Sequence, residues 1–206
     1  PAWKQYRMPS YKLTYFDVKG RAEETRLLFA LAKQDFEDHR IKKEDWPALK
    51  PSTPMGGLPI LEYDGVTIAQ SVAIARFVAR QCGLMGKSDL EAAQVDMIVD
   101  TITDVAAAAI DVVFAKEDVK EALAKKFNET TLPTHLEKLE KLLGNKEWFV
   151  GDSISWADVR MYCFFNVVFP SYGLSVTCWD KAPNLKKLAD KVAQIPEIKA
   201  WREKHP

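Results

Sequence analysis

The segment that most constrains the fold of this chain is residues 11–16, YKLTYF, whose side chains alternate in the pattern of a short, half-buried strand. It runs into a turn at Gly20 and then into residues 21–33, where apolar side chains recur at helical spacing and predict a helix. A second predicted strand, 36–41, and a short polar segment, 43–48, follow. A chain that begins β-α-β is expected to form a sheet with helices packed on it.

Two further strands are predicted at 59–63 and 66–69. They are joined by Asp64-Gly65, a pair typical of tight hairpins. Ser71 then begins a predicted helix whose apolar face continues to about residue 82. Residues 11–82 are therefore expected to form one α/β domain with a small mixed sheet.

The second half of the chain is predicted to be helical throughout, because apolar side chains recur every three or four residues in 95–105, 119–143 and 185–195. Pro133 lies inside the middle stretch and is expected to kink or divide it. Ser155, with an acid three residues later, is close to a capping box and marks the start of another buried helix. The predicted order is a leader or extension at 1–10, the α/β domain at 11–82, a linker at 83–88 and an all-α domain at 89–206.

The composition is that of a globular protein with a sizeable core, and its charge excludes some classes of partner. Lys plus Arg and Asp plus Glu number 29 each, so the chain lacks the basic surplus of a nucleic-acid-binding protein. It has neither a long apolar run typical of a membrane span nor an apolar signal region at its start. Its three cysteines and three histidines show no metal-ligand spacing. We therefore expect a cytosolic protein with reduced thiols, no membrane partner and no bound metal.

Tyr15 is a candidate catalytic residue because it ends the first predicted strand, with the cation of Arg21 nearby. A phenol that donates a hydrogen bond to a sulfur favours the thiolate over the thiol. Lowering a thiol pKa from about 8.5 by roughly two units requires about 2.7 kcal/mol. One hydrogen bond to a charged acceptor supplies about 1.5–3 kcal/mol, so a single phenol suffices. Taken alone, a tyrosine in a strand is more simply explained as a half-buried aromatic residue.

Two more positions could bind an extended peptide. A cis bond between Leu58 and Pro59 would leave the backbone of Leu58 free to pair with a peptide as an added strand. Gln70 and Ser71 stand where a helix begins, and the N-terminus of a helix attracts a carboxylate; the simpler alternative is that Ser71 only caps the helix. Together with Tyr15, these positions favour a site for a small thiol peptide over a metal or nucleotide site.

The order and spacing of these residues resemble those of the cytosolic glutathione transferases of the sigma class, the class that includes glutathione-dependent prostaglandin D synthases and invertebrate relatives. The resemblance covers residues 11 to about 201 and is densest in YKLTYFDVKGRAEETR (11–26), LPILEYDG (58–65), QSVAIARFVA (70–79) and WFVGDSISWAD (148–158). It implies a thioredoxin-like N-terminal domain, an all-helical C-terminal domain and a homodimer.

The resemblance also implies roles for individual residues. Tyr15 would stabilise the thiolate of glutathione, the co-substrate, and Arg21 would support Tyr15 electrostatically. The further residues implied in glutathione binding are Phe16, Trp46, Lys50, Leu58, Pro59, Gln70, Ser71 and, across the dimer interface, Asp104. The residues implied in the second-substrate pocket are Phe16, Val18, Ala106, Ile110, Phe114, Arg160 and Phe164.

The chain departs from the prostaglandin synthases of this class in several places. Gly57 stands where they carry a Lys, and Thr103 replaces an Asp of an acidic cluster that can bind a divalent cation. Small residues at 106–109 replace a region with a Trp, and the chain stops at Pro206, short of the tail that closes the pocket. The expected activity is therefore conjugation of glutathione to small hydrophobic electrophiles. The alternatives are glutathione-dependent prostaglandin isomerisation or lipid peroxide reduction, and a non-catalytic ligand-binding or crystallin-like role.

Overall fold

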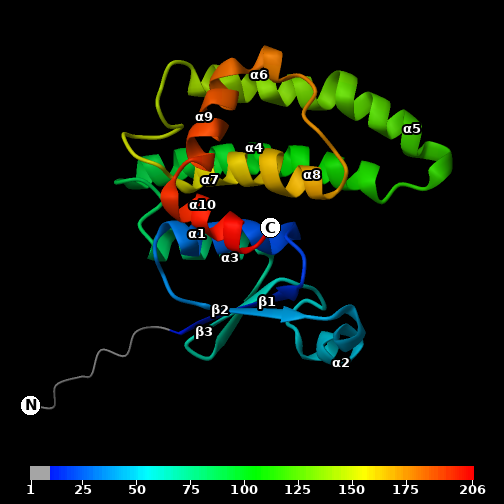
Figure 1. Cartoon of the computed structure of the whole chain (residues 1–206), viewed down its shortest axis with the longest axis vertical. Helices are drawn as coiled ribbons and strands as arrows, with labels where there is room; N and C mark the ends of the chain where they lie inside the picture. The colour runs from blue at the N-terminus through cyan, green and yellow to red at the C-terminus, as the bar shows by residue number, and fades with distance from the viewer. Residues whose placement is uncertain (1–9) are drawn as a thin grey trace, which may run out of the picture.

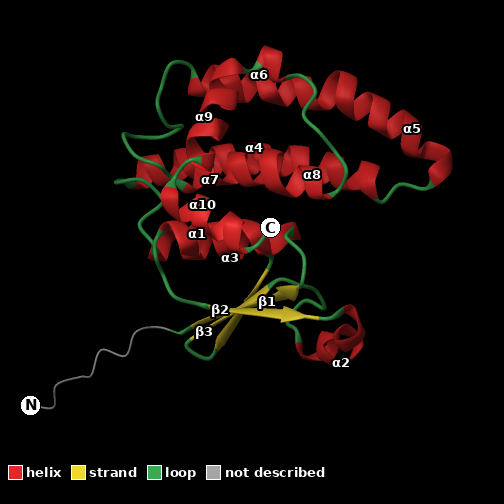
Figure 2. Cartoon of the chain, viewed as in Figure 1, coloured by secondary structure: helices red, strands yellow, loops and turns green. Residues whose placement is uncertain are grey.

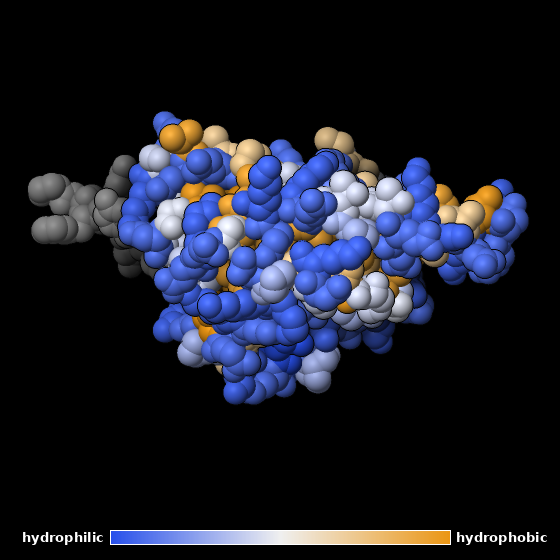
Figure 3. All heavy atoms as spheres, turned by 90° about the horizontal axis from the view of Figure 1, so that it is seen from above, coloured by the Kyte–Doolittle hydropathy of each residue, from blue (hydrophilic) through white to orange (hydrophobic). Residues whose placement is uncertain are grey.

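The computed structural model describes residues 10–206, so the predicted extension, apart from Ser10, lies outside the described residues. The molecule has a sheet at one end, a bundle of helices at the other, and helices α1 and α3 between them (Figures 1 and 2). Seen onto the bundle, the surface is mostly hydrophilic, with apolar side chains exposed in small groups (Figure 3). Within residues 10–206, none of the helices combines the length and apolar character that crossing a bilayer requires.

The sheet has four strands in the order β2-β1-β3-β4. β1 pairs with β2 in parallel, whereas the β1–β3 and β3–β4 pairs are antiparallel, so the predicted mixed sheet is confirmed. The strand bounds are β1 Tyr11–Phe16, β2 Glu37–Ile41, β3 Ile60–Tyr63 and β4 Val66–Ala69. The strand predicted from residue 59 begins one residue later, because a proline has no N–H to donate to the ladder. The cis bond between Leu58 and Pro59, which the sequence analysis considered as a way to free the Leu58 backbone, is present.

Three helices accompany the sheet. A 3-10 turn at Gly20–Ala22 leads into α1 (Glu23–Leu31), and α3 (Ser71–Gln81) packs beside α1. The segment predicted only as polar, 43–48, instead forms a 3-10 turn and the one-turn helix α2 (Trp46–Leu49). That turn is too short to show a helical period in the sequence.

The C-terminal half is helical, as predicted. Its elements are α4 (Asp89–Val113), α5 (Glu117–Lys126), α6 (Leu132–Leu143), α7 (Trp156–Cys163), α8 (Phe169–Ser171), α9 (Pro183–Ala193) and α10 (Pro196–Lys204). Pro133 does divide its stretch: α5 passes into α6 through a π-helical turn, Phe127–Thr131, because the proline cannot donate an intrahelical bond. α5 projects from the side of the bundle (Figure 1).

The segment between sheet and bundle, predicted as a linker at 83–88, is partly buried. Leu84 and Met85 lie in the core, and the Leu84 carbonyl accepts a hydrogen bond from the backbone N–H of Trp156 at 2.8 Å. The capping box at the start of α7 is also present: Asp158 accepts hydrogen bonds from the N–H and hydroxyl of Ser155, each at 2.8 Å. The apolar side chains of both halves form one continuous core, which fixes the position of the sheet relative to the bundle.

Candidate functional site

The first of two neighbouring cavities, the polar cavity, has a volume of about 300 Å³ and lies at the end of β1. It brings together eight of the residues predicted for ligand binding. These are Tyr15, Phe16, Arg21, Trp46, Leu58, Pro59, Gln70 and Ser71.

The Tyr15 hydroxyl lies inside a tight backbone turn. Tyr15 is buried, and its hydroxyl oxygen accepts a hydrogen bond from the backbone N–H of Arg21 at 3.3 Å. Gly20 has φ of +44°, and a Cβ at that position would lie 2.7 Å from the Tyr15 hydroxyl oxygen. Only glycine therefore allows the turn to approach the phenol so closely. Since the backbone amide occupies the oxygen as an acceptor, the phenol proton is available to a ligand.

Arg21 contributes its backbone rather than its side chain to the Tyr15 hydroxyl, and its side chain is exposed. The buried cation beneath Tyr15 is Arg26, which the sequence analysis missed. Its guanidinium lies 6.0 Å from the centroid of the Tyr15 ring, within reach of a cation–π interaction. The sequence offered one signal: a charged residue placed among the apolar positions of a helix.

Arg26 also fixes the loop that carries Gly20. Its guanidinium donates to the carbonyls of Val18 at 2.8 Å and Lys19 at 3.3 Å, and it is paired with Glu23 at 3.1 Å and Asp38 at 2.9 Å. The side chains of Arg26 and Glu23 are almost completely buried. Removing one member of such a network leaves an uncompensated charge, so Arg26 is a positioning residue for the turn around Tyr15.

Two backbone features belong to other segments that line the polar cavity. The N–H and C=O of Leu58 are not among the backbone hydrogen bonds formed within residues 10–206, so both can pair with a bound peptide. Gln70 has φ of +76°, a conformation that non-glycine residues seldom adopt outside functional sites. It is the N-cap of α3, and Ser71 is the first helical residue, one position later than the simple capping alternative requires.

Three of the predicted binding residues, Trp46, Lys50 and Asp104, differ in whether they line the polar cavity. Trp46 lines the polar cavity and meets the ring of Phe16 edge-on, with centroids 5.9 Å apart. Lys50 is exposed and does not line the cavity, although it lies beside Gly56, which does. Asp104 is exposed on α4 and lies outside both cavities of this single chain.

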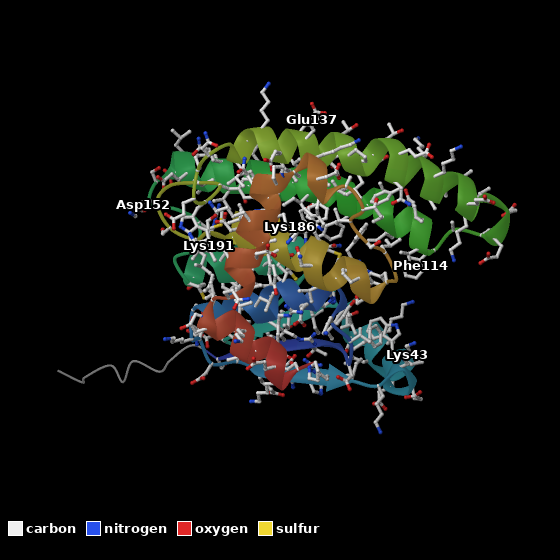
Figure 4. All side chains as sticks on the ribbon, turned by 45° about the horizontal axis from the view of Figure 1, so that its top comes forward. Lys43, Phe114, Glu137, Asp152, Lys186 and Lys191 are labelled. Atoms are coloured by element: carbon white, nitrogen blue, oxygen red, sulfur yellow. The ribbon has the colours of Figure 1, made fainter. Side chains whose placement is uncertain are left out.

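The second cavity, the apolar cavity, has a volume of about 210 Å³ and lies between the α1 turn and helices α4, α7 and α8. Five of the seven residues predicted for the second-substrate pocket line it: Ala106, Ile110, Phe114, Arg160 and Phe164. Of the other two, Phe16 lines the polar cavity, and Val18 lines neither and is 49% exposed, because its loop turns outward before Gly20. Phe114, at the end of α4, lies on the same side of the molecule as Lys43 in the turn before α2 (Figure 4). Arg21 and Ser71 line both cavities, so the two spaces adjoin next to Tyr15.

A buried ion pair forms one wall of the apolar cavity. Glu24, only 4% exposed, accepts hydrogen bonds from the Arg160 guanidinium and from the Trp156 indole N–H. Arg160 also donates to the Thr103 hydroxyl at 3.2 Å and lies 5.9 Å from the centroid of the Phe164 ring. The pair joins α1 to α7, so it holds the two domains together at the cavity.

The three cysteines are free, and one of them, Cys163, lines the apolar cavity. Burial raises the pKa of the Cys163 thiol well above its ordinary value, and this keeps the thiol neutral and weakly nucleophilic. No group of three or more His, Cys, Asp or Glu side chains within residues 10–206 is arranged to hold a metal ion.

Comparisons with known proteins agree with this geometry. Residues 11–80 match the family model described as glutathione S-transferase, N-terminal domain, and residues 103–205 match glutathione S-transferase, C-terminal domain. The chain is 45% identical over 203 residues to hematopoietic prostaglandin D synthase of Gallus gallus, covering 97% of this chain and 98% of that protein. It is 42% identical over 213 residues to glutathione S-transferase 1 of Ascaris suum, with the same two coverages. The structure described as rat hPGDS complexed with a quinoline is 39% identical and superposes with a TM-score of 0.84, covering 96% of this chain and 98% of that one.

Proposed function

This chain belongs to the glutathione S-transferase family, and from that premise we propose that Tyr15 holds glutathione as a thiolate which attacks small hydrophobic electrophiles in the apolar cavity. The observation that carries the proposal is the position of the Tyr15 hydroxyl. It accepts from the backbone N–H of Arg21, keeps its own proton for a ligand, and lies where the two cavities adjoin. A thiolate held there would face the electrophile directly.

The rest of the polar cavity supports binding of the tripeptide. The backbone of Leu58 is free to pair with the cysteinyl residue, and the N-terminus of α3, with the Ser71 hydroxyl, suits the γ-glutamyl carboxylate. The resemblance implies that Trp46, which lines the cavity, and Lys50, which lies beside Gly56, hold the glycine end. These contacts bind thiol and thiolate alike, so lowering the thiol pKa is left to Tyr15.

The test is Tyr15→Phe. We expect glutathione binding to change little and conjugation at neutral pH to fall about 30- to 100-fold, the equivalent of one lost hydrogen bond to a charged acceptor. Calorimetry measures binding, and the ultraviolet absorbance of the thiolate measures ionisation of the bound thiol. Tyr63→Phe is the matched control, because it removes a phenol hydroxyl in β3 outside both cavities. Wild-type turnover in Tyr15→Phe would contradict the role given to Tyr15.

We also propose that the protein is a homodimer in which Asp104 reaches the glutathione amine of the partner subunit. Apolar side chains are exposed on α4 at Met97 and on β4 at Val66, 48% and 64% respectively, and Asp104 is exposed on α4 as well. Light scattering measures the mass in solution and so tests the homodimer. We expect Asp104→Ala to weaken glutathione binding about threefold to tenfold, as for one lost charged contact near the surface. A monomer, or an unchanged dissociation constant in a proven dimer, would contradict this assignment.

Prostaglandin isomerisation is the second candidate function, because the Gallus gallus relative is named for it. Ala106, Ala107 and Ala109 favour conjugation instead, since they line the cavity from α4 with small side chains and leave that part of the wall open. Assaying conjugation, prostaglandin isomerisation and lipid peroxide reduction in parallel separates these activities. We place the protein in the cytosol, where its three free cysteines would stay reduced.

A further inference from the structure

Trp201, on the last helix, is bonded to the buried charges beneath Tyr15 although it lies outside the site. It belongs to α10, which packs against α1 (Figure 1). Its indole N–H donates to Oε1 of Glu23 at 3.1 Å, although 178 positions separate the two residues in the sequence. Trp201 lines neither the polar nor the apolar cavity. It can therefore affect a bound ligand only through the residues that it contacts.

The Glu23 carboxylate is shared between two donors. Its Oε2 accepts from the Arg26 guanidinium at 3.1 Å, and its Oε1 accepts from Trp201. Glu23 is only 1% exposed, so water does not screen its charge. Hydrogen bonds to a buried carboxylate spread its negative charge onto the donors. The indole N–H of Trp201 therefore weakens the negative field that Glu23 exerts on its surroundings.

Arg26 carries this effect to the polar cavity. Its guanidinium lies 6.0 Å from the centroid of the Tyr15 ring. Its Nη2 is buried and has no hydrogen-bond partner within residues 10–206, so this edge of the cation is not screened by an acceptor. The positive charge favours negative charge at the Tyr15 hydroxyl and on a sulfur bound to it. Glu23 opposes that effect, and the hydrogen bond from Trp201 reduces the opposition.

We infer that Trp201 is a positioning residue for catalysis, which stabilises the thiolate of bound glutathione by holding the Glu23 carboxylate beside Arg26. This inference rests on the proposed function and adds a residue of α10 to it. The role predicts a change in the pKa of the bound thiol. A residue that only anchors α10 would instead change stability and leave that pKa where it is.

Other titratable groups also face Glu23 and Trp201. Burial raises the pKa of the Tyr162 phenol and of the Cys163 thiol on α7, so both stay neutral at neutral pH. The His205 ring packs on the indole of Trp201 with centroids 3.9 Å apart, and its Nδ1 lies 2.9 Å from the Trp201 carbonyl oxygen. His205 is retained in every variant compared below. The remaining charged side chains around this network are Asp38, Arg40, Arg202, Glu24 and Arg160.

The experiment compares Trp201→Phe and Glu23→Gln with the wild-type protein. Thiolate absorbance, titrated in the glutathione complex, gives the thiol pKa, and the pH dependence of kcat/KM for an electrophile gives a second value. We expect Trp201→Phe to raise the thiol pKa by about half a unit. Conjugation below that pKa then slows about threefold, and conjugation well above it does not change. Glu23→Gln should lower the thiol pKa by a similar amount, because it removes the opposing charge.

Trp179→Phe is the matched control. Trp179 is half-buried like Trp201 and lines neither cavity. It packs edge-on against Phe165, and its indole N–H donates to no other group in the part of the chain that the structure describes. We expect this variant to keep the wild-type thiol pKa.

A wild-type thiol pKa in Trp201→Phe, whatever the stability of that variant, would overturn the inference. A raised pKa in both variants would also overturn it, because a displaced turn rather than a changed charge would then be the cause. If only Glu23→Gln folds, a lowered pKa supports the inference and any other result overturns it. A wild-type complex whose thiol titrates near its ordinary value of about 8.5 would instead refute the role of Tyr15, and the proposed function would fail before this inference does.

Discussion

The polar and apolar cavities adjoin next to Tyr15, yet they are built in different ways. The polar cavity is formed within residues 15–71 and depends on backbone geometry: the glycine turn at Gly20, the cis bond before Pro59 and the positive φ of Gln70. The apolar cavity is formed by side chains from the α1 turn, α4, α7 and α8, elements that lie far apart in the sequence. The polar cavity, shaped by the backbone, suits one fixed ligand, whereas the apolar cavity, shaped by side chains, suits a class of ligands.

The forces in the two cavities differ accordingly. Hydrogen bonds to backbone groups are directional, so a small displacement of Gly20 or Leu58 is costly for the ligand that uses them. Apolar contact is non-directional and proportional to area, so the apolar cavity can accept differently shaped electrophiles. Polar groups that line it, such as the Arg160 guanidinium, can still favour some of these electrophiles over others.

The largest effect should come from the ion pair that joins the two regions. Replacing Glu24 with Gln leaves the Arg160 guanidinium without its counter-charge, and breaking a buried pair in this way costs about 3 kcal/mol of unfolding free energy. We also expect KM for the electrophile to rise, since Arg160 forms part of the apolar wall. The glutathione dissociation constant should stay within about twofold, because the polar cavity does not include Glu24. Chemical denaturation measures the free energy of unfolding, steady-state kinetics measures KM, and calorimetry measures the glutathione dissociation constant.

Glu37→Gln is the matched control for that variant. Glu37 forms an exposed ion pair with Lys12 at 3.4 Å, and such pairs contribute less than about 1 kcal/mol. If Glu24→Gln weakened glutathione binding as strongly as electrophile binding, the two cavities would not be independent, and the comparison drawn above would be wrong.

The next largest effect should come from Gly20→Ala, which acts on the polar side. The added Cβ would lie 2.7 Å from the Tyr15 hydroxyl oxygen and 2.9 Å from its Cε1, so the phenol must move away from the sulfur. The positive φ adds about 1 kcal/mol of strain. We expect conjugation of every electrophile to fall about tenfold or more, since a displaced phenol loses part of its bond to the thiolate. Gly65→Ala in the hairpin is the control, because it also has a positive φ but nothing within 4 Å of the added Cβ.

The electrophile dependence of the Gly20→Ala variant is informative. A loss shared by every electrophile places the defect at the sulfur, as the structure of the Tyr15 turn predicts. A loss confined to one kind of electrophile would instead place the defect in the apolar cavity, and would contradict the separate roles of the two cavities.

The sequence predicted features that depend on neighbouring residues. The alternation at 11–16, the Asp64-Gly65 hairpin and the capping box at Ser155 each occupy fewer than ten residues, and each appears in the structure as predicted. The resemblance then indicated the residues that line the polar cavity, because that cavity is assembled from short, contiguous motifs. The one-turn helix α2 was missed because four residues are too few to show a period.

Features that depend on contacts between distant residues were not predicted. The pairing of Glu24 with Arg160 and the position of Tyr172 in the apolar cavity follow only from the packing of α7 and α8 against α1. The burial of Arg26 could not be predicted from the sequence for the same reason, since the Val18 carbonyl and the Asp38 carboxylate that it bonds lie in a loop and in a strand outside the helix. Val18 was assigned to the pocket wall, but its loop turns it toward solvent.

The smallest effect should come from narrowing the apolar cavity with Ala106→Leu. Ala106 lines the cavity from α4, and leucine keeps the helix propensity while filling part of a space of about 210 Å³. We expect KM for bulky electrophiles to rise about threefold to fivefold, as for a modest loss of apolar fit, with compact electrophiles and glutathione binding unaffected. Ala93→Leu on the exposed surface of α4 is the control. A weaker affinity for glutathione in Ala106→Leu would mean that the apolar wall also shapes the polar cavity, and that a single space, rather than two adjoining ones, receives both substrates.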